Sequence, residues 1–398
     1  MVIFGLLGGV VKVTPIDTAW RKTLGGLGWF GHQVKSMWPF KGSPGVASFS
    51  FLPKGKKTAN YLVAVTKQAG GATYLSTLLL VSYDSRSKTA GMVFIPNDLL
   101  VATPGMGSDQ VSNLVELDGG RIDAVRVTVA NLLGVKADRY ALASDSDLRL
   151  ILKQLGDRFT IAVPSRLSYK DPGLKANINL KPGTQTVDAT VLASYLTYGQ
   201  PGKSMDLAKR QADFAPRFIS MIGATDVDRF MAKNSNLFDT DASSRELAGL
   251  VKTLSSLKGG GLEIAVLPVK EFRYEKTVVN RTDTEALPGF VKRYLKTDSP
   301  VTGRRIKVEV LNGCGVPGIG GKVSSRIDLT RFQVVNSANA DSFDNPETLI
   351  VVYSDDKNVI NAANELKNEL EAGRVVSQPQ AQSLSEISVV VGKDYASK

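Results

Sequence analysis

Cysteine and histidine are almost absent from this chain of 398 residues, which contains one of each, Cys314 and His32. A single cysteine excludes an internal disulfide framework and a structural zinc site built on cysteines. A single histidine excludes a histidine-rich metal site. A Cys–His catalytic pair is disfavoured too, because the two residues lie far apart in the sequence.

The apolar run at the N-terminus, Met1–Val11, is too short to cross a bilayer, which takes about 20 apolar residues. It is either the end of a membrane-spanning helix or the apolar region of an export signal, although the basic residues that a signal needs do not precede it. Trp20, Trp29 and Trp38 follow among lysines and arginines, a mixture that suits the head-group layer of a membrane. Alternatively, the rings pack in a core or stack on single-stranded nucleic acid. We predict that residues 1–57 form a membrane-proximal basic and aromatic segment.

The net charge of +11 is unevenly distributed. Residues 1–60 hold eight Lys and Arg against one Asp, whereas residues 304–398 hold eleven basic against twelve acidic residues. A basic surface favours phosphate groups in lipid head groups, nucleic acid or an anionic polymer. Because the basic residues stand beside the tryptophans and no nucleic-acid recognition motif is present, we expect a membrane surface or a transmembrane anchor as a partner, and no nucleic acid.

The apolar and polar periodicity predicts two α/β units. Charged residues make up 22% and apolar residues 43%, enough for more than one core. Apolar runs indicate strands at 61–65, 78–81 and 91–95, and helical spacing indicates helices at 121–133, 148–155, 186–198, 204–221, 244–257 and 283–295. Pro216 should kink or break the helix that contains it. We predict an α/β sandwich at 58–300, a linker near 297–300 and a second, smaller α/β domain at 304–398.

A glycine-rich turn at 313–318 matches G-x-G-x-x-G between a predicted strand and helix. This pattern binds a pyrophosphate when an acidic residue follows about 20 positions later, and none is well placed here. A tight strand-to-helix turn is the simpler interpretation, with Cys314 as a small packing residue.

Lys209 and Arg210 lie side by side on a predicted helix, where they either clamp phosphate oxygens or form a solvated face paired with Asp206 or Asp213. Spacing alone does not decide between the two.

Ordered motifs across most of the chain resemble the LytR–CpsA–Psr family of bacterial envelope proteins. In the larger unit they are 76–82, 94–98, 124–134, 163–164, 180–185 and 209–211. In the smaller unit, 310–313, Gly315 and 392–394 resemble the C-terminal domain often attached to that family. The resemblance implies an extracytoplasmic protein on an N-terminal membrane anchor that transfers glycopolymers from a polyprenyl-pyrophosphate carrier to the cell wall. It also implies an α/β/α sandwich with a hydrophobic lipid cavity, arginines that grip the pyrophosphate, and acidic residues that hold Mg²⁺.

Several charged positions of the family are neutral here. The family's Arg-Ser-Asp-Thr becomes Tyr74-Leu75-Ser76-Thr77, its Ile-Pro-Arg-Asp becomes Ile95-Pro96-Asn97-Asp98, and its paired arginines fall on Thr197 and Gly199. The candidates for binding a lipid phosphate are Arg210, Lys209, Gln211, Asp98 and Asn97. One carboxylate does not replace several around Mg²⁺, so we expect no metal site and no cofactor unless the chain is an active transferase.

Three functions stay open from the sequence. The first is a catalytically impaired relative that binds a polyprenyl-phosphate lipid or partner proteins of the cell wall or envelope. The second is an active phosphotransferase that uses the remaining charged residues with Mg²⁺. The third is a structural surface protein whose two domains serve as interaction modules.

Overall fold

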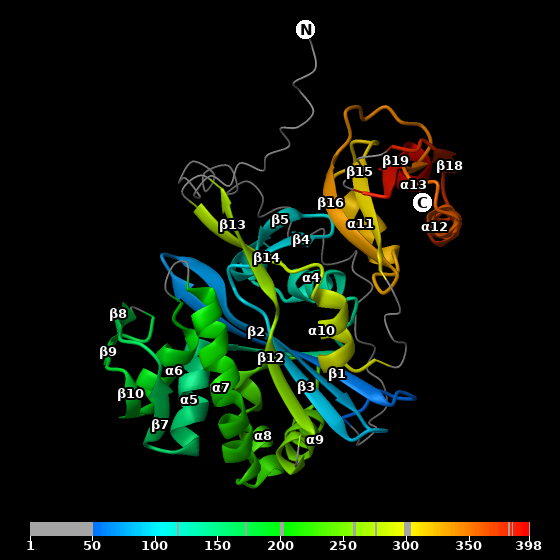
Figure 1. Cartoon of the computed structure of the whole chain (residues 1–398). Helices are drawn as coiled ribbons and strands as arrows, with labels where there is room; N and C mark the ends of the chain where they lie inside the picture. Colours follow the sequence, from blue (N-terminus) through cyan, green and yellow to red (C-terminus); the bar gives the residue numbers. More distant parts are fainter. Residues whose placement is uncertain are drawn as a thin grey trace. The chain divides into compact units, whose positions relative to one another are not determined.

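The computed structural model describes residues 51–117, 119–171, 173–199, 203–257, 260–274, 277–297, 304–380, 383 and 385–397 (Figure 1). The predicted membrane-proximal segment at 1–57 therefore lies almost wholly outside the described residues. No helix within these ranges combines the length and the apolarity that crossing a bilayer requires. The described elements are two α/β groups, as the sequence predicts.

A six-stranded mixed sheet forms the centre of the larger group, in the order β11-β6-β1-β2-β3-β12. The strands are β1 (Thr58–Ala69), β2 (Ala72–Asp84), β3 (Thr89–Phe94), β6 (Arg139–Ser144), β11 (Asp239–Thr240) and β12 (Leu262–Val266). β1, β2 and β3 are antiparallel neighbours, while β6 runs parallel to β1 and β12 parallel to β3. Strands at the centre of such a sheet are apolar on both sides because helices cover both faces.

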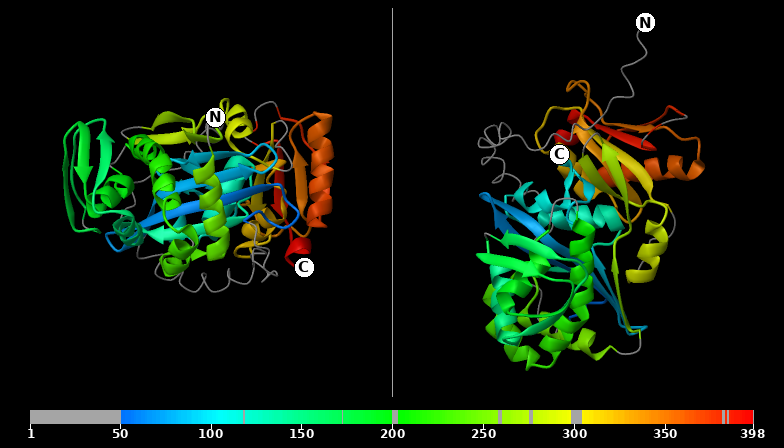
Figure 2. Two further views of the ribbon diagram at one scale, coloured as in Figure 1. Left: turned by 90° about the horizontal axis from the view of Figure 1, so that it is seen from below. Right: turned by 60° about the vertical axis from the view of Figure 1, so that its left-hand side comes forward.

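The two faces of the sheet bury alternate residues of β2, as the period of a strand requires. Leu78 and Leu80 pack with α3 (Leu114–Leu117), α4 (Asp123–Leu133) and α10 (Leu287–Tyr294). Leu79 and Val81 face the opposite layer. That layer contains α5 (Asp145–Leu155), α7 (Ser204–Gly223), α8 (Val227–Lys233) and α9 (Ser244–Ser256). The predicted α/β/α sandwich is confirmed (Figures 1 and 2).

Four short antiparallel strand pairs and one helix complete this group. β7 (Phe159–Val163) pairs with β10 (Gly183–Val187), β8 (Leu167–Asp171) with β9 (Ala176–Leu180), β4 (Leu100–Thr103) with β5 (Gly107–Gln110), and β13 (Val269–Tyr274) with β14 (Thr277–Thr282). α6 (Ala189–Thr197) packs with the strand pair β7–β10 and the β8–β9 hairpin around a separate apolar cluster. The 3₁₀ turns are η2 (Val111–Asn113) and η3 (Ser235–Leu237).

Two predicted helices start later than expected. The helix predicted from residue 186 begins at Ala189, because residues 183–187 form β10 and the Asp188 carboxylate accepts a hydrogen bond from the Val191 amide at 2.8 Å. The helix predicted from residue 283 begins at Leu287, after a turn in which the Asp283 carboxylate accepts two backbone amides. The predicted ranges thus include Asp188, which caps α6, and Asp283, which belongs to the turn before α10.

The predicted interruption at Pro216 is wrong in its stronger form, since α7 continues through Pro216 as one helix of 20 residues. Proline removes one helical hydrogen bond and crowds the preceding turn. Ala215 and Ile219, beside it, are buried against the sheet, so packing holds the helix together across the proline.

The smaller group is a five-stranded sheet in the order β16-β15-β19-β17-β18. Its strands are β15 (Ile306–Asn312), β16 (Phe332–Asn339), β17 (Leu349–Val352), β18 (Arg374–Ser377) and β19 (Ile387–Val391), and its helices are α11 (Ile319–Arg326), α12 (Lys357–Leu370) and α13 (Lys393–Ala396). β17 runs antiparallel to β19, while the other neighbours are parallel. The predicted second, smaller α/β domain is confirmed.

Asn131 of α4 joins the two groups through the edge strand β16. Its amide nitrogen donates to the carbonyl oxygen of Val334 and its amide oxygen accepts the Val334 N–H, both at 2.8 Å. Arg305 donates to the carbonyl oxygens of Asn131 and Leu132 at the end of α4, at 2.5 and 2.7 Å. Desolvation in this position lowers the pKa of Arg305 to about 10. Side chains thus satisfy backbone groups that an edge strand and a helix end leave unpaired.

Replacing Asn131 with alanine should lower the free energy of unfolding by about 2–4 kcal/mol, because it leaves a buried N–H and a buried C=O of Val334 without partners. Urea denaturation of the purified chain measures the change. Asn336→Ala is the control, since its amide bonds Glu309 at an exposed position, and it should cost less than about 1 kcal/mol. Equal costs for the two variants would contradict this description of the joint.

Candidate functional site

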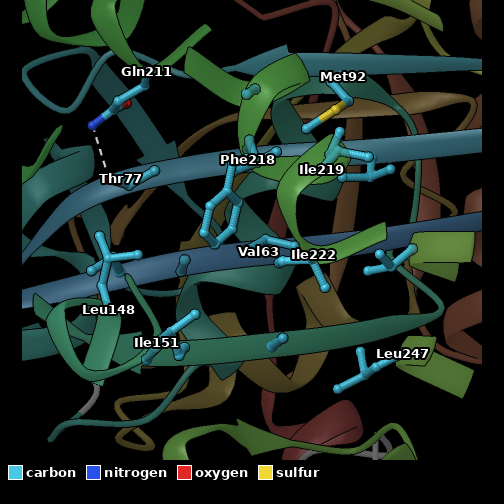
Figure 3. Close-up of a pocket in the computed structure, with 18 of the residues that line it drawn as sticks. Val63, Thr77, Met92, Leu148, Ile151, Gln211, Phe218, Ile219, Ile222 and Leu247 are labelled. Carbon is cyan, nitrogen blue, oxygen red and sulfur yellow. Dashed lines mark hydrogen bonds between the residues drawn. The ribbon is translucent and has the colours of Figure 1, made fainter. Parts of the chain in front are cut away.

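A cavity of about 220 Å³ lies between the central sheet and the layer of α5, α7, α8 and α9. Apolar side chains line it almost completely, and the polar residues on its wall are Thr77 and Gln211. Figure 3 shows Gln211 and Thr77 joined at one end of the cavity, with Val63, Ile151, Phe218, Ile219, Ile222 and Leu247 around the rest. Such a wall favours a hydrocarbon ligand over a polar one.

Small side chains on the strands leave room for this cavity. Ala141 and Ala143 of β6 and Ala215 of α7 line it, whereas the side chain of Ala64 of β1 packs in the opposite layer. Protein interiors are filled to the density of organic crystals, so small side chains on facing elements leave space that larger aliphatic residues would fill. These three alanines therefore contribute to the cavity.

Gln211 forms hydrogen bonds within the protein at the polar end of the cavity. Its amide nitrogen donates to the carbonyl oxygen of Ser76 at 3.1 Å, to Oγ1 of Thr77 at 2.8 Å and to the carbonyl oxygen of Leu196 at 2.7 Å. These bonds tie α7 to β2 and α6. The predicted phosphate ligand Gln211 thus lies at the cavity wall, with its nitrogen engaged within the protein.

Arg210, the preceding residue on α7, is a buried cation with only 6% of its surface exposed. Its Nη2 donates to the carbonyl oxygen of Tyr198 at 2.9 Å, and its guanidinium carbon lies 4.8 Å from the centre of the Tyr195 ring. Nε and Nη1 are buried and have no hydrogen-bond partner among the residues that the structure describes. Burial lowers the pKa of the guanidinium from its ordinary value.

No carboxylate forms an ion pair with Arg210 within the described part of the chain, so the predicted pairing with Asp206 is not found. A buried charge with unpartnered donors is costly unless a counter-charge reaches it. An anion beside Nε and Nη1 would supply the acceptors that these nitrogens lack.

Lys209 does not join Arg210 in this arrangement. Its side chain is exposed, because successive residues on a helix point about 100° apart. Lys209 therefore lies on a solvated helix face, which is one of the two interpretations that its sequence allows. Arg210 is buried and does not belong to that face.

Asp98 lies at the N-terminal end of α7, where its carboxylate is surrounded by donors. Asn280 of β14 donates to both carboxylate oxygens, at 2.9 and 3.0 Å, and the Ser204 hydroxyl donates to one of them. Asn97 is half-buried and its amide nitrogen lies 3.5 Å from the Leu75 carbonyl oxygen. The rise of the helix separates Ser204 from Arg210 by about 9 Å, so the predicted residues fall into two groups along α7.

The described residues do not fit a Mg²⁺ site of the kind that the family resemblance implies. They contain no cluster of three or more His, Cys, Asp or Glu side chains. Ser76, at the family's aspartate position, donates its hydroxyl to the Val65 carbonyl oxygen at 3.0 Å, and Thr197 donates to the Ala193 carbonyl oxygen at 2.8 Å. Mg²⁺ binds through carboxylates in near-octahedral geometry, and of the family's two aspartate positions named above only Asp98 carries a carboxylate, whose oxygens already accept hydrogen bonds.

A buried ionic network supports the helix that carries Tyr195. Lys67 of β1 pairs with Asp171 of β8 at 2.7 Å and with Asp145 at 2.9 Å. Asp171 also accepts the Ser194 hydroxyl of α6 at 2.6 Å. Burial alone would raise the pKa of Asp171, but the hydrogen bonds from Lys67 and Ser194 outweigh it and hold that pKa below its ordinary value of 3.8.

Because the pKa of Asp171 is depressed on folding, its contribution to stability is present above about pH 4 and is lost as the pH falls through the lower folded-state value. Asp171→Asn should therefore cost about 2–3 kcal/mol at neutral pH, and this difference should shrink below about pH 4. Denaturant unfolding across the acid range measures it. Asp84→Asn, whose carboxylate pairs with the exposed Arg86, should cost less than about 1 kcal/mol. A pH-independent cost for Asp171→Asn would contradict the assignment.

The glycine-rich turn at 313–318 is a strand-to-helix turn closed on itself. The side-chain oxygen of Asn312 accepts the backbone amides of Cys314 and Gly315, at 3.3 and 2.9 Å. Gly315 and Gly318 have positive φ angles of 73° and 76°, which favour glycine. The amides that a pyrophosphate would need already have an internal partner, which supports the simpler interpretation.

Four residues of the site were missed from the sequence: Ser204, Asn280, Tyr195 and Tyr198. Asn280 lies 182 positions from Asp98, and no local pattern marks such a pair. Nothing in the local sequence indicates that Arg210 packs on the ring of Tyr195 and donates to the carbonyl oxygen of Tyr198, which lies just after the end of α6.

The comparisons with known proteins cover both groups of elements. The model of the LytR_cpsA_psr family matches residues 55–292, and that of the LytR_C domain, described as LytR cell envelope-related transcriptional attenuator, matches residues 305–395. Among curated proteins, the chain is 23% identical over 223 residues to TagT of Bacillus subtilis (strain 168), a polyisoprenyl-teichoic acid–peptidoglycan teichoic acid transferase. The match covers 54% of this chain and 66% of TagT, so the chain spans just under two thirds of that relative.

Two solved structures show a similar fold. B. subtilis TagV has a TM-score of 0.51 at 19% identity, with 60% of this chain and 95% of that chain covered. A Streptococcus agalactiae protein has a TM-score of 0.50 at 15% identity, with 61% and 90% covered. At these identities the likeness concerns the fold.

Proposed function

Because the chain belongs to the LytR–CpsA–Psr family, we propose that it binds a polyprenyl-phosphate lipid, with the hydrocarbon in the apolar cavity and the phosphate at Arg210. The observation that carries this proposal is a buried guanidinium with two unpartnered nitrogens, directly before the glutamine at the polar end of that cavity. An amphiphile with an anionic head and a long apolar tail matches both features at once.

The cavity and Arg210 supply different contacts to such a lipid. The cavity wall stabilises the hydrocarbon tail by about 0.8 kcal/mol per buried methylene. A phosphate at Nε and Nη1 supplies the acceptors that these nitrogens lack, and in a desolvated position such charge-assisted bonds are strong. Tyr195 and Tyr198 hold the guanidinium in place through ring stacking and the carbonyl bond.

We propose a binding role in cell-wall assembly rather than polymer transfer. Transfer from a pyrophosphate carrier develops charge on the departing phosphate, and stabilising it takes several cationic or metal-bound groups. Tyr74, Ser76, Asn97, Thr197 and Gly199 are neutral at the positions where the family resemblance implies charge. Removal of one such group typically lowers the rate by about 10²–10³. The proposal places the protein in the envelope, at the outer side of the membrane.

The active phosphotransferase is the second candidate, since the name of the relative TagT describes a transferase and both Arg210 and Asp98 remain. A purely structural role has less support, because it favours a filled cavity and an Arg210–Asp206 pair, and the described residues have neither.

The experiment has two arms. Binding of a polyprenyl phosphate to the purified chain is measured by native mass spectrometry or by protection against unfolding. Transfer of a glycopolymer from a polyprenyl-pyrophosphate carrier is measured with and without Mg²⁺. We expect binding and no transfer. Turnover that Arg210→Ala abolishes would establish the transferase instead, and absence of binding would overturn the lipid proposal.

A further inference from the structure

The β13–β14 hairpin carries exposed apolar side chains that the cavity and its site do not use. Phe272 of β13 is 44% exposed and Val278 of β14 is 37% exposed. The hairpin extends away from the helical layers beside β4 and β5 (Figure 1). In the described structure, both apolar side chains therefore leave more than a third of their surface in water.

The two apolar side chains lie on opposite faces of the ribbon. Residues paired across antiparallel strands point to the same side, and Phe272 pairs with Val279 while Val278 pairs with Arg273. Phe272 and Arg273 are adjacent on one strand, so their side chains point to opposite sides. A protein groove covers one face of a ribbon, whereas a layer of lipid head groups surrounds both.

Cations accompany each apolar side chain. The Arg281 guanidinium lies 4.3 Å from the centre of the Phe272 ring, and Arg273 stands opposite Val278. Within the described residues neither arginine has an acidic partner, whereas Lys270 pairs with Asp283 and Glu285 at the base of the hairpin. Arginine beside aromatic and aliphatic side chains is the composition that suits an anionic head-group layer.

The base of the hairpin is fixed to the body of the domain. Val279 and Asn280 are buried, Asn280 bonds Asp98, and Leu99 forms a parallel bridge with Asn280. Because the base of the hairpin is already held in place, binding through its exposed side chains does not require the rest of the domain to become ordered.

We propose that the β13–β14 hairpin inserts its Phe272 and Val278 side chains into an anionic lipid surface, with Arg273 and Arg281 at the head-group phosphates. This contact does not depend on the cavity holding a lipid, because it rests on exposure and charge at a different part of the domain. It orients the domain so that Asp98, at the base of the hairpin, faces the membrane side.

The test is a fluorescence measurement on the full chain. Cys314→Ser removes the single thiol, and Val278→Cys then takes an environment-sensitive NBD label. Vesicles of equal parts phosphatidylglycerol and phosphatidylcholine should shift the emission to the blue and brighten it, and vesicles of phosphatidylcholine alone should do so much less. Arg273→Gln should raise the lipid concentration at half-maximal shift about fivefold, the effect of one cation near an anionic surface.

Phe343→Cys in the same background is the matched control, since Phe343 is 45% exposed in the smaller domain and should report no shift. Co-sedimentation of the labelled chain with the vesicles establishes that protein is bound. Bound protein without a shift at position 278 would overturn the proposal, as would an absence of vesicle binding. A label that is already blue-shifted before lipid is added would assign the hairpin to a contact within the protein, which also contradicts it.

Discussion

Arg210→Met should lower the affinity for polyprenyl phosphate by about 10² or more without destabilising the fold. The phosphate loses a charge-assisted partner in a desolvated position, which costs about 2–5 kcal/mol. The folded protein, by contrast, loses a buried cation whose Nε and Nη1 have no partner in the described ranges of the chain. Replacing such a charge with an apolar side chain of similar size is often neutral or stabilising, so the free energy of unfolding should fall by no more than about 1 kcal/mol.

This pair of opposite results separates a ligand site from a structural role. Lys209→Met is the matched control, because Lys209 is the exposed neighbour on the same helix. It should leave lipid affinity within about twofold, as expected for a solvated charge. If Arg210→Met unfolded the chain while Lys209→Met did not, the guanidinium would be a structural element and the lipid proposal would lose its main support.

Ala215→Phe should abolish binding of long polyprenyl phosphates while leaving a short prenyl phosphate bound. Ala215 lines the cavity, and a phenyl ring at this position occupies space that the hydrocarbon would take. Excluding one isoprene unit costs about 4 kcal/mol at 0.8 kcal/mol per methylene, or ~10³ in affinity. The short ligand keeps its phosphate contact with Arg210. Isothermal titration with ligands of increasing chain length measures the difference.

The control for this variant is Ala232→Phe, since Ala232 is exposed on α8 and does not line the cavity. It should bind both ligands as the parent chain does. Because the ring of Ala215→Phe enters existing space, thermal unfolding should show no large loss of stability. Equal binding of the long lipid by both variants would show that the hydrocarbon lies elsewhere.

Local pattern was sufficient for most of the fold. The apolar runs in β1 and β2 and the helical spacing in α4 and α9 predict elements that the structure contains, because their periods follow directly from which faces are buried. The starts of α6 and α10 were wrong where Asp188 and Asp283 act through their carboxylates rather than as ordinary helical residues. The predicted break at Pro216 is wrong because the packing that holds α7 together is not visible in its own sequence.

The candidate site, like the fold, could be predicted only in part from the sequence. Arg210 and Gln211 could be singled out from a motif, but their environments could not. Gln211 turned out to fasten α7 to its neighbours, and Lys209, one residue before Arg210, is solvated. Asn280 could not be found at all, since its bond with Asp98 joins segments far apart in the chain. Burial and partner identity depend on tertiary contacts, which a single sequence does not display.

The most direct measurement is a crystal structure of the chain with a polyprenyl phosphate bound. We expect phosphate oxygens within hydrogen-bonding distance of Nε and Nη1 of Arg210, and hydrocarbon running along α7 past Ala215 and Ile219. A phosphate held elsewhere, with the cavity closed and Arg210 turned to an acidic side chain, would contradict it.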